Sequence, residues 1–551
     1  MNAPFSTLLR QRAGAGGLRG SRRQPTSWAT RWIAGLLLCL LAGCATLPDE
    51  FERTPSKAIA LSTETALGRI AASSQPDPDL SGFRLMPSGD FALSTRLELA
   101  RRAQRTLDVQ YYLIDNDETG RFVLRTLRDA ALRGVRVRLL LDDLHTSGAD
   151  DLLLALAATP NLELRLFNPF PAGRSGMIPR FVFSLFDFTR VNRRMHNKLF
   201  IADGAMAVAG GRNIGDAYFR HAAEANFLDL DTFVTGALIP RLASLFDLYW
   251  NSPHVRPIDT VVAPTLPPAL LREHFEASTA PDTTPAPRSP PPNDVLGYGP
   301  LVDDLDAGRL GLIWTLAEAY ADSPDRVIGK SASYGGVPLL DVDSVRYNVR
   351  EQMRRARKEV TLVSPYLIPG KAGLEVIREI TGRGIKIEAV TNSLAATDEP
   401  LVHAGYRRYR RDMLRLGVQL YELSSVRTRR SVRLGLFGTQ VGRLHAKAAV
   451  IDGRALFVGS MNFDPRSEIH NTEIGIIAFS PELAQQVLRL VGELKQQGSY
   501  KVQFAPGEDE RLQWVGGDPA APQVLEAEPD ATFKDRLMLE LLAPFAPESL
   551  L

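Results

Sequence analysis

Two stretches of the chain repeat the same order of apolar and polar positions. The first begins at Ala103 as AQRTLDVQYYLI and continues from Leu124 as LRTLRDAALRGVRVRLLLDDL. The second begins at Ala356 as ARKEVTLVSPYLI and continues from Leu374 as LEVIREITGRGIKIEAVTNSL. In each stretch, runs rich in β-branched residues flank a segment whose apolar residues have helical spacing and which ends near a glycine. Each is therefore predicted to form a strand, a helix and a second strand, with the strands parallel and the crossover right-handed.

A third pair of similar blocks extends the repeat. MHNKLFIADGAMAVAGGRN begins at Met195, and LHAKAAVIDGRALFVGSMN begins at Leu444. Corresponding blocks lie about 250 residues apart along the chain, which indicates a duplicated domain. The predicted fold class is α/β, with two copies of a mixed or parallel sheet flanked by helices.

Composition suggests how the rest of the chain is organised. Nine of the 37 prolines fall within residues 264–292, a density typical of an extended linker or a long surface loop. Residues 45–80 and 503–530 are rich in loop-forming residues, and the pattern FKDRLMLELLAPF from Phe533 predicts a docked helix. The predicted parts are a tether (45–80), a first domain (81–260), a linker or loop (261–295), a second domain (296–502) and a C-terminal extension (503–551).

The first 44 residues have the pattern of an export signal. Residues 1–31 carry six arginines and no acid, and the apolar run from Trp32 to Ala42 is about half of the ~20 residues that span a bilayer. The run ends in Leu41-Ala42-Gly43-Cys44, which resembles the lipobox of bacterial lipoproteins. We expect a signal peptide over residues 1–43 and a lipid anchor on Cys44, which would place the protein on the exoplasmic or periplasmic side of a bacterial envelope. A plain signal peptide or a buried helix is the alternative, and the choice of membrane stays open.

Overall composition adds mainly exclusions. A hydrophobic content of 44% and a charged content of 23% are ordinary for a globular protein. The net charge of +2 includes the six arginines of the export signal, so the mature chain would be mildly acidic. The two cysteines, Cys39 and Cys44, both precede residue 45, which excludes a disulfide-stapled body and a cysteine zinc site.

The third pair of blocks carries the candidate chemistry. The first block has His196-x-Lys198, four residues, Asp203, six residues and then Gly210-Gly211-x-Asn213; the second has the same spacing from His445 through Lys447, Asp452 and Gly459-Ser460 to Asn462. In a strand, the His and Lys two positions apart would share a face, and the Asp-Gly dipeptides are typical of hairpin turns. Imidazole can act as a nucleophile and as a proton donor, while lysine supplies positive charge to a phosphoryl oxygen. Two such sets would surround a tetrahedral phosphorus without a metal or another cofactor. A lone H-x-K is usually an ordinary surface strand, but identical spacing in two corresponding places argues against that interpretation.

This pattern resembles the phospholipase D superfamily, whose HxK(x)4D(x)6GSxN motif occurs twice per active site. The match is complete in the second copy and departs in the first only at Gly211, where serine is usual. The chain is more similar still to bacterial cardiolipin synthases, especially the C type, in RRMHNKLFIADG, GGRNIGDAYF, TNSLAATD, VHAGYRRYR and the ending Leu550-Leu551. The resemblance implies a duplicated phospholipase D-like fold with one active site between the halves.

Residue roles follow from the resemblance. It implies a catalytic set consisting of His196, Lys198, Asp203, His445, Lys447 and Asp452. His196 is the expected nucleophile, forming a phosphatidyl-histidine, and His445 is the expected general acid and later base. The lysines, Asn213, Asn462 and Ser460 are expected to bind the substrate, and the two aspartates to hold their turns. Glu473 is expected to orient His196, and either Asp229 or Asp231 to orient His445; a solvated surface charge is the alternative for each acid.

The implied reaction forms cardiolipin from phosphatidylglycerol and a second phospholipid, either phosphatidylethanolamine or phosphatidylglycerol. The expected partners are phospholipid substrates and a membrane, a small accessory protein is left open, and no nucleic acid is expected. Phe181–Phe188, followed by arginines, is interpreted as a lipid-facing lip or as a buried helix. His403, one helical turn from Arg407, could help a second phosphate site or be a capping or solvated residue. Hydrolytic phospholipase D, a phosphodiesterase or nuclease, and a non-catalytic lipid-binding lipoprotein are the competing functions.

Overall fold

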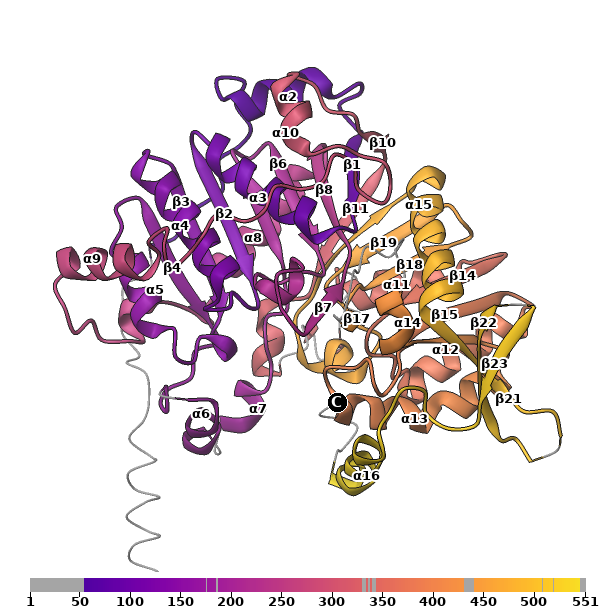
Figure 1. Cartoon of the computed structure of the whole chain (residues 1–551). Coiled ribbons are helices and arrows are strands. Elements are labelled where there is room, and N and C mark those ends of the chain that lie inside the picture. Colours follow the sequence, from indigo (N-terminus) through magenta and orange to yellow (C-terminus); the bar gives the residue numbers. More distant parts are fainter. Residues whose placement is uncertain are drawn as a thin grey trace, which may run out of the picture. The chain divides into compact units, whose positions relative to one another are not determined.

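The computed structural model describes residues 54–545, apart from residues 175, 185–186, 330–332, 335–336, 339–342, 431–440, 508 and 519 (Figure 1). Every described residue belongs to one compact unit of the chain. Trp32–Ala42 and Cys44, on which the predictions of export and lipidation depend, lie outside the described residues. Among the residues that are described, none forms a helix long and apolar enough to cross a membrane.

The first half of the repeat forms a mixed sheet. Its parallel part consists of β2 (Thr106–Tyr111), β3 (Arg136–Asp142) and β4 (Leu162–Phe167), and the other neighbouring strands pair antiparallel. Helix α4 (Glu118–Leu132) connects β2 to β3, as the sequence predicts. The strand order is β10 (Ile313–Thr315), β1 (Ser81–Met86), β8 (Asp231–Gly236), β6 (Met206–Gly210), β5 (Leu199–Ala202), β2 (Thr106–Tyr111), β3 (Arg136–Asp142), β4 (Leu162–Phe167) and β9 (Val255–Pro257).

The second half repeats this arrangement. Its parallel part consists of β14 (Glu359–Val363), β15 (Lys386–Asn392) and β16 (Gln419–Leu423). The hairpin of β18 (Ala448–Ile451) and β19 (Ala455–Gly459) corresponds to β5 and β6. The order is β11 (Ala317–Ala321), β20 (Ile474–Ala478), β19 (Ala455–Gly459), β18 (Ala448–Ile451), β14 (Glu359–Val363), β15 (Lys386–Asn392), β16 (Gln419–Leu423), β21 (Ser499–Phe504), β22 (Leu512–Asp518) and β23 (Ala521–Leu525). The predicted duplicated α/β fold is confirmed.

Helices flank both sheets (Figure 1). The first half contains α2 (Ala66–Ser74), α3 (Gly89–Arg102), α4 (Glu118–Leu132), α5 (Asp150–Ala157), α6 (Met177–Phe183), α7 (Phe188–Val191) and α8 (Ile239–Trp250), followed by α9 (Pro268–Ser278) and α10 (Leu301–Asp306). The second half contains α11 (Val345–Arg354), α12 (Gly370–Gly382), α13 (Pro400–Arg415), α14 (Ser425–Arg430), α15 (Pro481–Glu493) and α16 (Phe533–Leu542).

The two halves share a hydrophobic core. Alternate residues of β5 face opposite ways: Phe200 packs among residues of α3, α4 and α5, whereas Leu199 and Ile201 join a cluster that includes residues of the second half. In β18, Ala448 and Val450 belong to the same shared cluster. Alternate residues of β5 and of β18 therefore point into the same core, so the two copies of the motif lie on sheets that pack against each other.

Three segments expected to be loop-rich contain regular structure. Residues 45–80 include α2, and residues 503–530 include the antiparallel pair β22 and β23. The proline-rich range contains α9, which buries Leu271 and Phe275 in the core that also holds α5. Helix α16 forms as predicted, although Leu539 is its buried apolar residue and several others are exposed. Proline at the start of α9 is compatible with a helix, because the first turn has no intrahelical acceptor for its missing N–H.

Candidate active site

The predicted hairpins position both copies of the motif. Asp203 and Gly204 have φ angles of 52° and 58°, and Asp452 and Gly453 have φ angles of 54° and 63°. Two successive residues with positive φ are characteristic of the tight turn favoured by right-twisted hairpins. These turns join β5 to β6 and β18 to β19, which confirms the expectation from the Asp-Gly dipeptides.

The H-x-K residues precede their strands instead of lying within them. His196 and Lys198 lead into β5, and His445 and Lys447 lead into β18. Their backbone is held by the opposite half: the N–H of His196 donates to Thr472 O, and the N–H of His445 donates to Leu228 O, both at 2.8 Å. Beside them, β7 (Ala225–Leu228) and β17 (Val441–Leu444) form a parallel pair across the two halves, where Figure 1 shows them adjacent. Sequence periodicity cannot reveal such pairing, because it depends on a partner far away in the chain.

Asp203 and Asp452 do not join the two histidines. The carboxylate of Asp203 accepts backbone N–H groups of residues 104–106 at 2.8–3.1 Å. Asp452 does the same for residues 357–359 at 2.7–3.1 Å. Both aspartates therefore fasten the hairpin turn to the start of the neighbouring strand. This geometry agrees with the turn-holding role expected of both aspartates, and their part in catalysis stays a prediction.

Each histidine contacts a carboxylate from the opposite half. His196 Nδ1 lies 2.9 Å from Glu473 Oε2, and His445 Nδ1 lies 2.6 Å from Asp229 Oδ2. Asp231 points elsewhere, because its carboxylate binds Arg96 at 2.8 Å and Arg212 at 3.4 Å. The structure thus chooses between the two aspartates that spacing left open. With Nδ1 bound to an acid, Nε2 of each ring remains for chemistry.

The departure at Gly211 has a steric reason. A Cβ at Gly211 would lie 2.1 Å from Asp229 Oδ1, so a serine cannot fit beside that carboxylate in its present position. At the corresponding place in the other copy, the Ser460 hydroxyl donates to the Glu473 carboxylate. Ser460 is fully buried in contact with Glu473, and its role in binding substrate stays a prediction. The shorter acid, Asp229, therefore lies beside Gly211, and the longer acid, Glu473, lies beside Ser460.

Both lysines are buried beside the histidines. Lys198 Nζ donates to His196 O at 2.6 Å, and Lys447 Nζ donates to His445 O at 2.5 Å. Burial holds the pKa of Lys198 well below its usual range and lowers the pKa of Lys447 to about 8. An anionic phosphate would favour the charged form of both amines, because an opposite charge nearby stabilises it.

The two histidine–acid pairs differ electrostatically. Burial, followed by the positive charges of Lys198 and Lys447, holds the pKa of His196 well below its usual range, and burial raises the pKa of Glu473 to about 7. Burial and the positive charge of Lys447 also lower the pKa of His445, but Asp229 opposes this effect through its charge and its hydrogen bond. Burial alone would raise the pKa of Asp229, yet His445 and Lys447 bring it below its usual range. The His196 pair therefore favours neutral imidazole, and the His445 pair is better suited to carry a proton.

Aromatic residues that sequence reasoning missed flank both rings. Tyr112 meets His196 edge-on at 5.0 Å between ring centroids, and its hydroxyl lies 2.9 Å from His145 Nε2. Tyr218 and Phe227 lie 5.2 and 4.9 Å from the His445 ring. Tyr111 ends the parallel strand β2, and Tyr112 follows it directly. Residues at the carboxyl ends of parallel strands often contact ligands, so this position could have indicated Tyr112 as a site residue.

One further residue holds the backbone just before each histidine. Asp142 Oδ2 accepts the N–H of Met195 at 2.8 Å. Asn392 makes two hydrogen bonds with the backbone of Leu444, each of 2.9 Å. Asp142 and Asn392 end β3 and β15, so they occupy corresponding places in the repeat.

The predicted phosphate-binding asparagines are buried near the motif. Asn213 donates to the Tyr218 hydroxyl at 2.9 Å. Asn213 Oδ1 and Asn462 Oδ1 have no hydrogen-bond partner among the described residues. Among the residues that the structure describes, no group of three or more His, Cys, Asp or Glu side chains is arranged to hold a metal ion.

The segment interpreted as a lip or a buried helix is short and partly exposed. Helix α6 ends at Phe183 and α7 begins at Phe188, while residues 185 and 186 lie outside the described residues. Ile178, Val182, Phe183 and Phe188 are exposed. This exposure argues against a fully buried helix.

Comparisons with known proteins agree with the duplicated motif. The family model described as "Cardiolipin synthase, PLD-like domain" matches residues 97–250 and 349–494. Cardiolipin synthase C of Escherichia coli is 37% identical over 474 residues, covering 84% of this chain and 94% of the relative.

The chain belongs to the cardiolipin synthase family.

A more distant relative and a solved structure are also similar to this chain, and the solved structure has the same fold. Cardiolipin synthase A of Pseudomonas fluorescens is 25% identical over 407 residues, covering 73% of this chain and 66% of the relative. The crystal structure of phosphatidylserine synthase from Haemophilus influenzae has a TM-score of 0.54 and 14% identity, and the match covers 88% of this chain and all of that one. This cardiolipin synthase family member is a phospholipase D-type phosphatidyltransferase.

Proposed function

We propose that the protein forms cardiolipin. It would transfer a phosphatidyl group from phosphatidylglycerol or phosphatidylethanolamine to a hydroxyl of phosphatidylglycerol. The observation that carries this proposal is the cross-half pairing of His196 with Glu473 and of His445 with Asp229, with a buried lysine beside each histidine. Similarity to Escherichia coli cardiolipin synthase C supports the choice of product.

In the first step, His196 Nε2 attacks the phosphorus of the donor lipid. A nitrogen–phosphorus bond forms as the bond from phosphorus to the headgroup oxygen breaks, giving phosphatidyl-histidine. His445, as an imidazolium held by Asp229, gives its proton to the departing oxygen. Lys198 and Lys447 stabilise the negative charge on the other phosphoryl oxygens. Positioned acid–base groups typically contribute about 10²–10⁴-fold to a rate, and preorganised charge can contribute as much.

In the second step, the same groups act in reverse. Neutral His445 takes the proton of the phosphatidylglycerol hydroxyl, and the hydroxyl oxygen attacks phosphorus. The nitrogen–phosphorus bond breaks, cardiolipin leaves, and His196 returns to neutral imidazole. Water in place of the alcohol would give phosphatidic acid, so the acceptor decides between transfer and hydrolysis.

The proposal includes a membrane location. The lipobox-like residues 41–44 would attach the mature chain to the exoplasmic or periplasmic side of an envelope membrane. The exposed apolar residues of α6 and α7 would then contact lipid near the site. A lipid anchor suits an enzyme whose substrates are membrane phospholipids.

The test is to incubate the full chain with vesicles containing labelled phosphatidylglycerol and phosphatidylethanolamine. Labelled cardiolipin is the expected product, and the position of the label identifies the donor. Phosphatidic acid alone would assign hydrolysis, while no lipid product would favour a nuclease or a non-catalytic lipoprotein. His196→Ala and His445→Ala should each abolish most of the product, whereas His274→Ala, an exposed histidine on α9, should not.

A further inference from the structure

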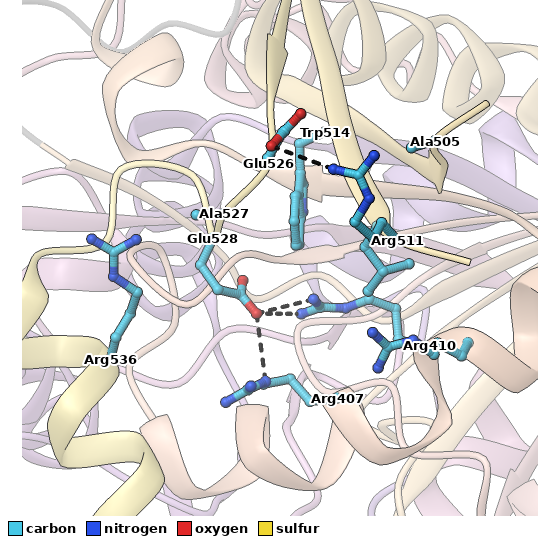
Figure 2. Close-up of a pocket in the computed structure, with 11 residues that line it drawn as sticks. Arg407, Arg410, Ala505, Arg511, Trp514, Glu526, Ala527, Glu528 and Arg536 are labelled. Atoms are coloured by element: carbon cyan, nitrogen blue, oxygen red, sulfur yellow. Dashed lines mark hydrogen bonds and ion pairs between the residues drawn. The ribbon is translucent and has the colours of Figure 1, made fainter. Parts of the chain in front are cut away.

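A cavity lies in the second half of the chain, and none of the motif residues line it. It has a volume of about 380 Å³ and lies between α13, the turn from β21 to β22, the segment after β23, and α16. Its lining includes five arginines but only two glutamates: Arg407, Arg410, Arg411, Arg511, Arg536, Glu526 and Glu528. Figure 2 shows Glu528 between Arg536, which extends from α16, and Arg511 on the opposite side.

A buried charge network forms one wall of this cavity. Arg410 binds Glu528 at 2.9 Å and Glu422 at 3.0 Å. His403 Nε2 lies 3.2 Å from the Arg410 guanidinium. The arginine and both carboxylates are almost fully buried, so these charges largely neutralise one another and fix the wall. His403 is therefore a buried member of this network and not a solvated residue.

The other four arginines differ in how they are paired. Arg511 is paired with Asp509 at 2.5 Å, and Arg407 is paired with Glu540 at 2.8 Å. Arg411 and Arg536 line the cavity without a side-chain hydrogen bond or ion pair to any described residue. Guanidinium groups bind phosphate in a planar, two-pronged geometry, and a cavity of this size can hold a phosphodiester headgroup.

Helix α16 connects the cavity to an exposed apolar surface. Phe533, Leu537 and Leu541 occupy every fourth position and are 76%, 46% and 58% exposed. On another face, Leu539 is buried against Leu394 and Ala404. Residues four apart share one face of a helix, so the exposed side forms an apolar stripe. The same helix supplies Arg536 to the cavity, which brings an apolar face and a cationic site together.

We propose that this cavity binds the headgroup phosphate of an anionic phospholipid while the apolar face of α16 enters the surface of the bilayer. The site is non-catalytic and holds the second half of the enzyme on the membrane that contains its substrates. The choice of a bilayer over a soluble phosphate rests on the adjoining apolar stripe and on the proposed function. A cation next to inserted apolar residues is the usual arrangement of an interfacial helix on an anionic membrane.

The test measures local protection, because a lipid anchor would attach the chain to any vesicle. The full-length His196→Ala chain is reconstituted in phosphatidylcholine vesicles with or without phosphatidylglycerol, so that the lipid is not consumed. Amide hydrogen exchange is followed across residues 526–545. Phosphatidylglycerol is expected to slow exchange in α16 roughly tenfold, an effect of the size that one or two arginines near an anionic surface supply. Unchanged exchange would overturn the proposal.

Matched variants locate the effect. Arg411→Gln/Arg536→Gln should remove the protection that phosphatidylglycerol confers, whereas Arg355→Gln/Arg357→Gln, which removes the same charge from exposed positions, should retain it. Equal protection in both double variants would also overturn the proposal. If the first pair lowers thermal stability, Arg411→Gln alone, at an exposed position, replaces it.

A soluble ligand is distinguished by adding inorganic phosphate to phosphatidylcholine vesicles. Protection under these conditions would assign the cavity to free phosphate and contradict the lipid assignment. Cardiolipin formation by the wild-type chain is measured separately. Loss of protection with intact synthesis would reject the lipid site alone, while intact protection without synthesis would reject the proposed function alone.

Discussion

Replacement of Gly211 by serine tests how the active site positions His445. The substitution installs the residue that the second copy carries at Ser460. In the first copy, the new Cβ would lie 2.1 Å from Asp229 Oδ1 and 3.0 Å from Asp229 Cγ. Because non-bonded heavy atoms come to rest at roughly 3.5 Å, the carboxylate must move by about 1 Å or more.

The size of the effect follows from the hydrogen bond that this movement breaks. Asp229 Oδ2 lies 2.6 Å from His445 Nδ1, and a displacement of about 1 Å takes the contact beyond hydrogen-bond range. A hydrogen bond to a charged group is worth about 1.5–3 kcal/mol, which corresponds to roughly 10- to 100-fold in rate. We therefore expect kcat to fall by that factor, with little change in KM, because both lysines stay in place.

The assay is cardiolipin formation from phosphatidylglycerol vesicles, with thermal melting as the measure of folding. Gly382→Ser is the matched control, since a Cβ at Gly382 meets no atom within 4 Å. The control should keep wild-type kcat. A Gly211→Ser enzyme with wild-type kcat would show that Asp229 does not position His445 and would refute the steric argument.

Other predictions concern the same site. Asp229→Asn should lower kcat about 10²–10⁴-fold with little loss of thermal stability. Asp231→Asn should mainly lower the melting temperature, because it removes the buried carboxylate that pairs with Arg96. The reverse pattern would mean that the two aspartates are assigned wrongly. Burial lowers the pKa of Lys447 to about 8, so its positive charge is present below that pH and lost above it. We therefore expect kcat/KM to decline as pH rises through 8. A constant kcat/KM well above that pH would contradict this prediction. EDTA treatment should leave activity unchanged, since lysines supply the charge, and activity restored only by added divalent cation would contradict this.

Much of the fold could be predicted because its signals are local. The runs before and after Gly134 and Gly384 have the period of strands and helices, and the repeat revealed the duplication. The Asp-Gly turns were likewise visible as dipeptides. The pair β22 and β23 was missed because its residues, including Gly516 and Gly517, resemble a loop and gain their order from pairing with each other.

The site was harder to complete, because half of it depends on contacts between the halves. Spacing identified His196 and His445 but could not decide between Asp229 and Asp231, which lie two positions apart and face different partners. The H-x-K segments also lie outside strands, since their hydrogen-bond partners belong to the opposite half. The difference between Gly211 and Ser460 became meaningful only once the neighbouring acids were seen.

The role of His196 as nucleophile is the central claim, and trapping the intermediate tests it most directly. The donor is a phosphatidyl ester of p-nitrophenol, whose leaving group departs without a proton, so the first step does not need His445. The reaction is stopped with denaturant at alkaline pH, and the modified peptide is identified by mass spectrometry. We predict that His445→Ala accumulates a phosphatidyl group on His196 and that His196→Ala carries none. A phosphatidyl group on His445, or none in either variant, would contradict the account.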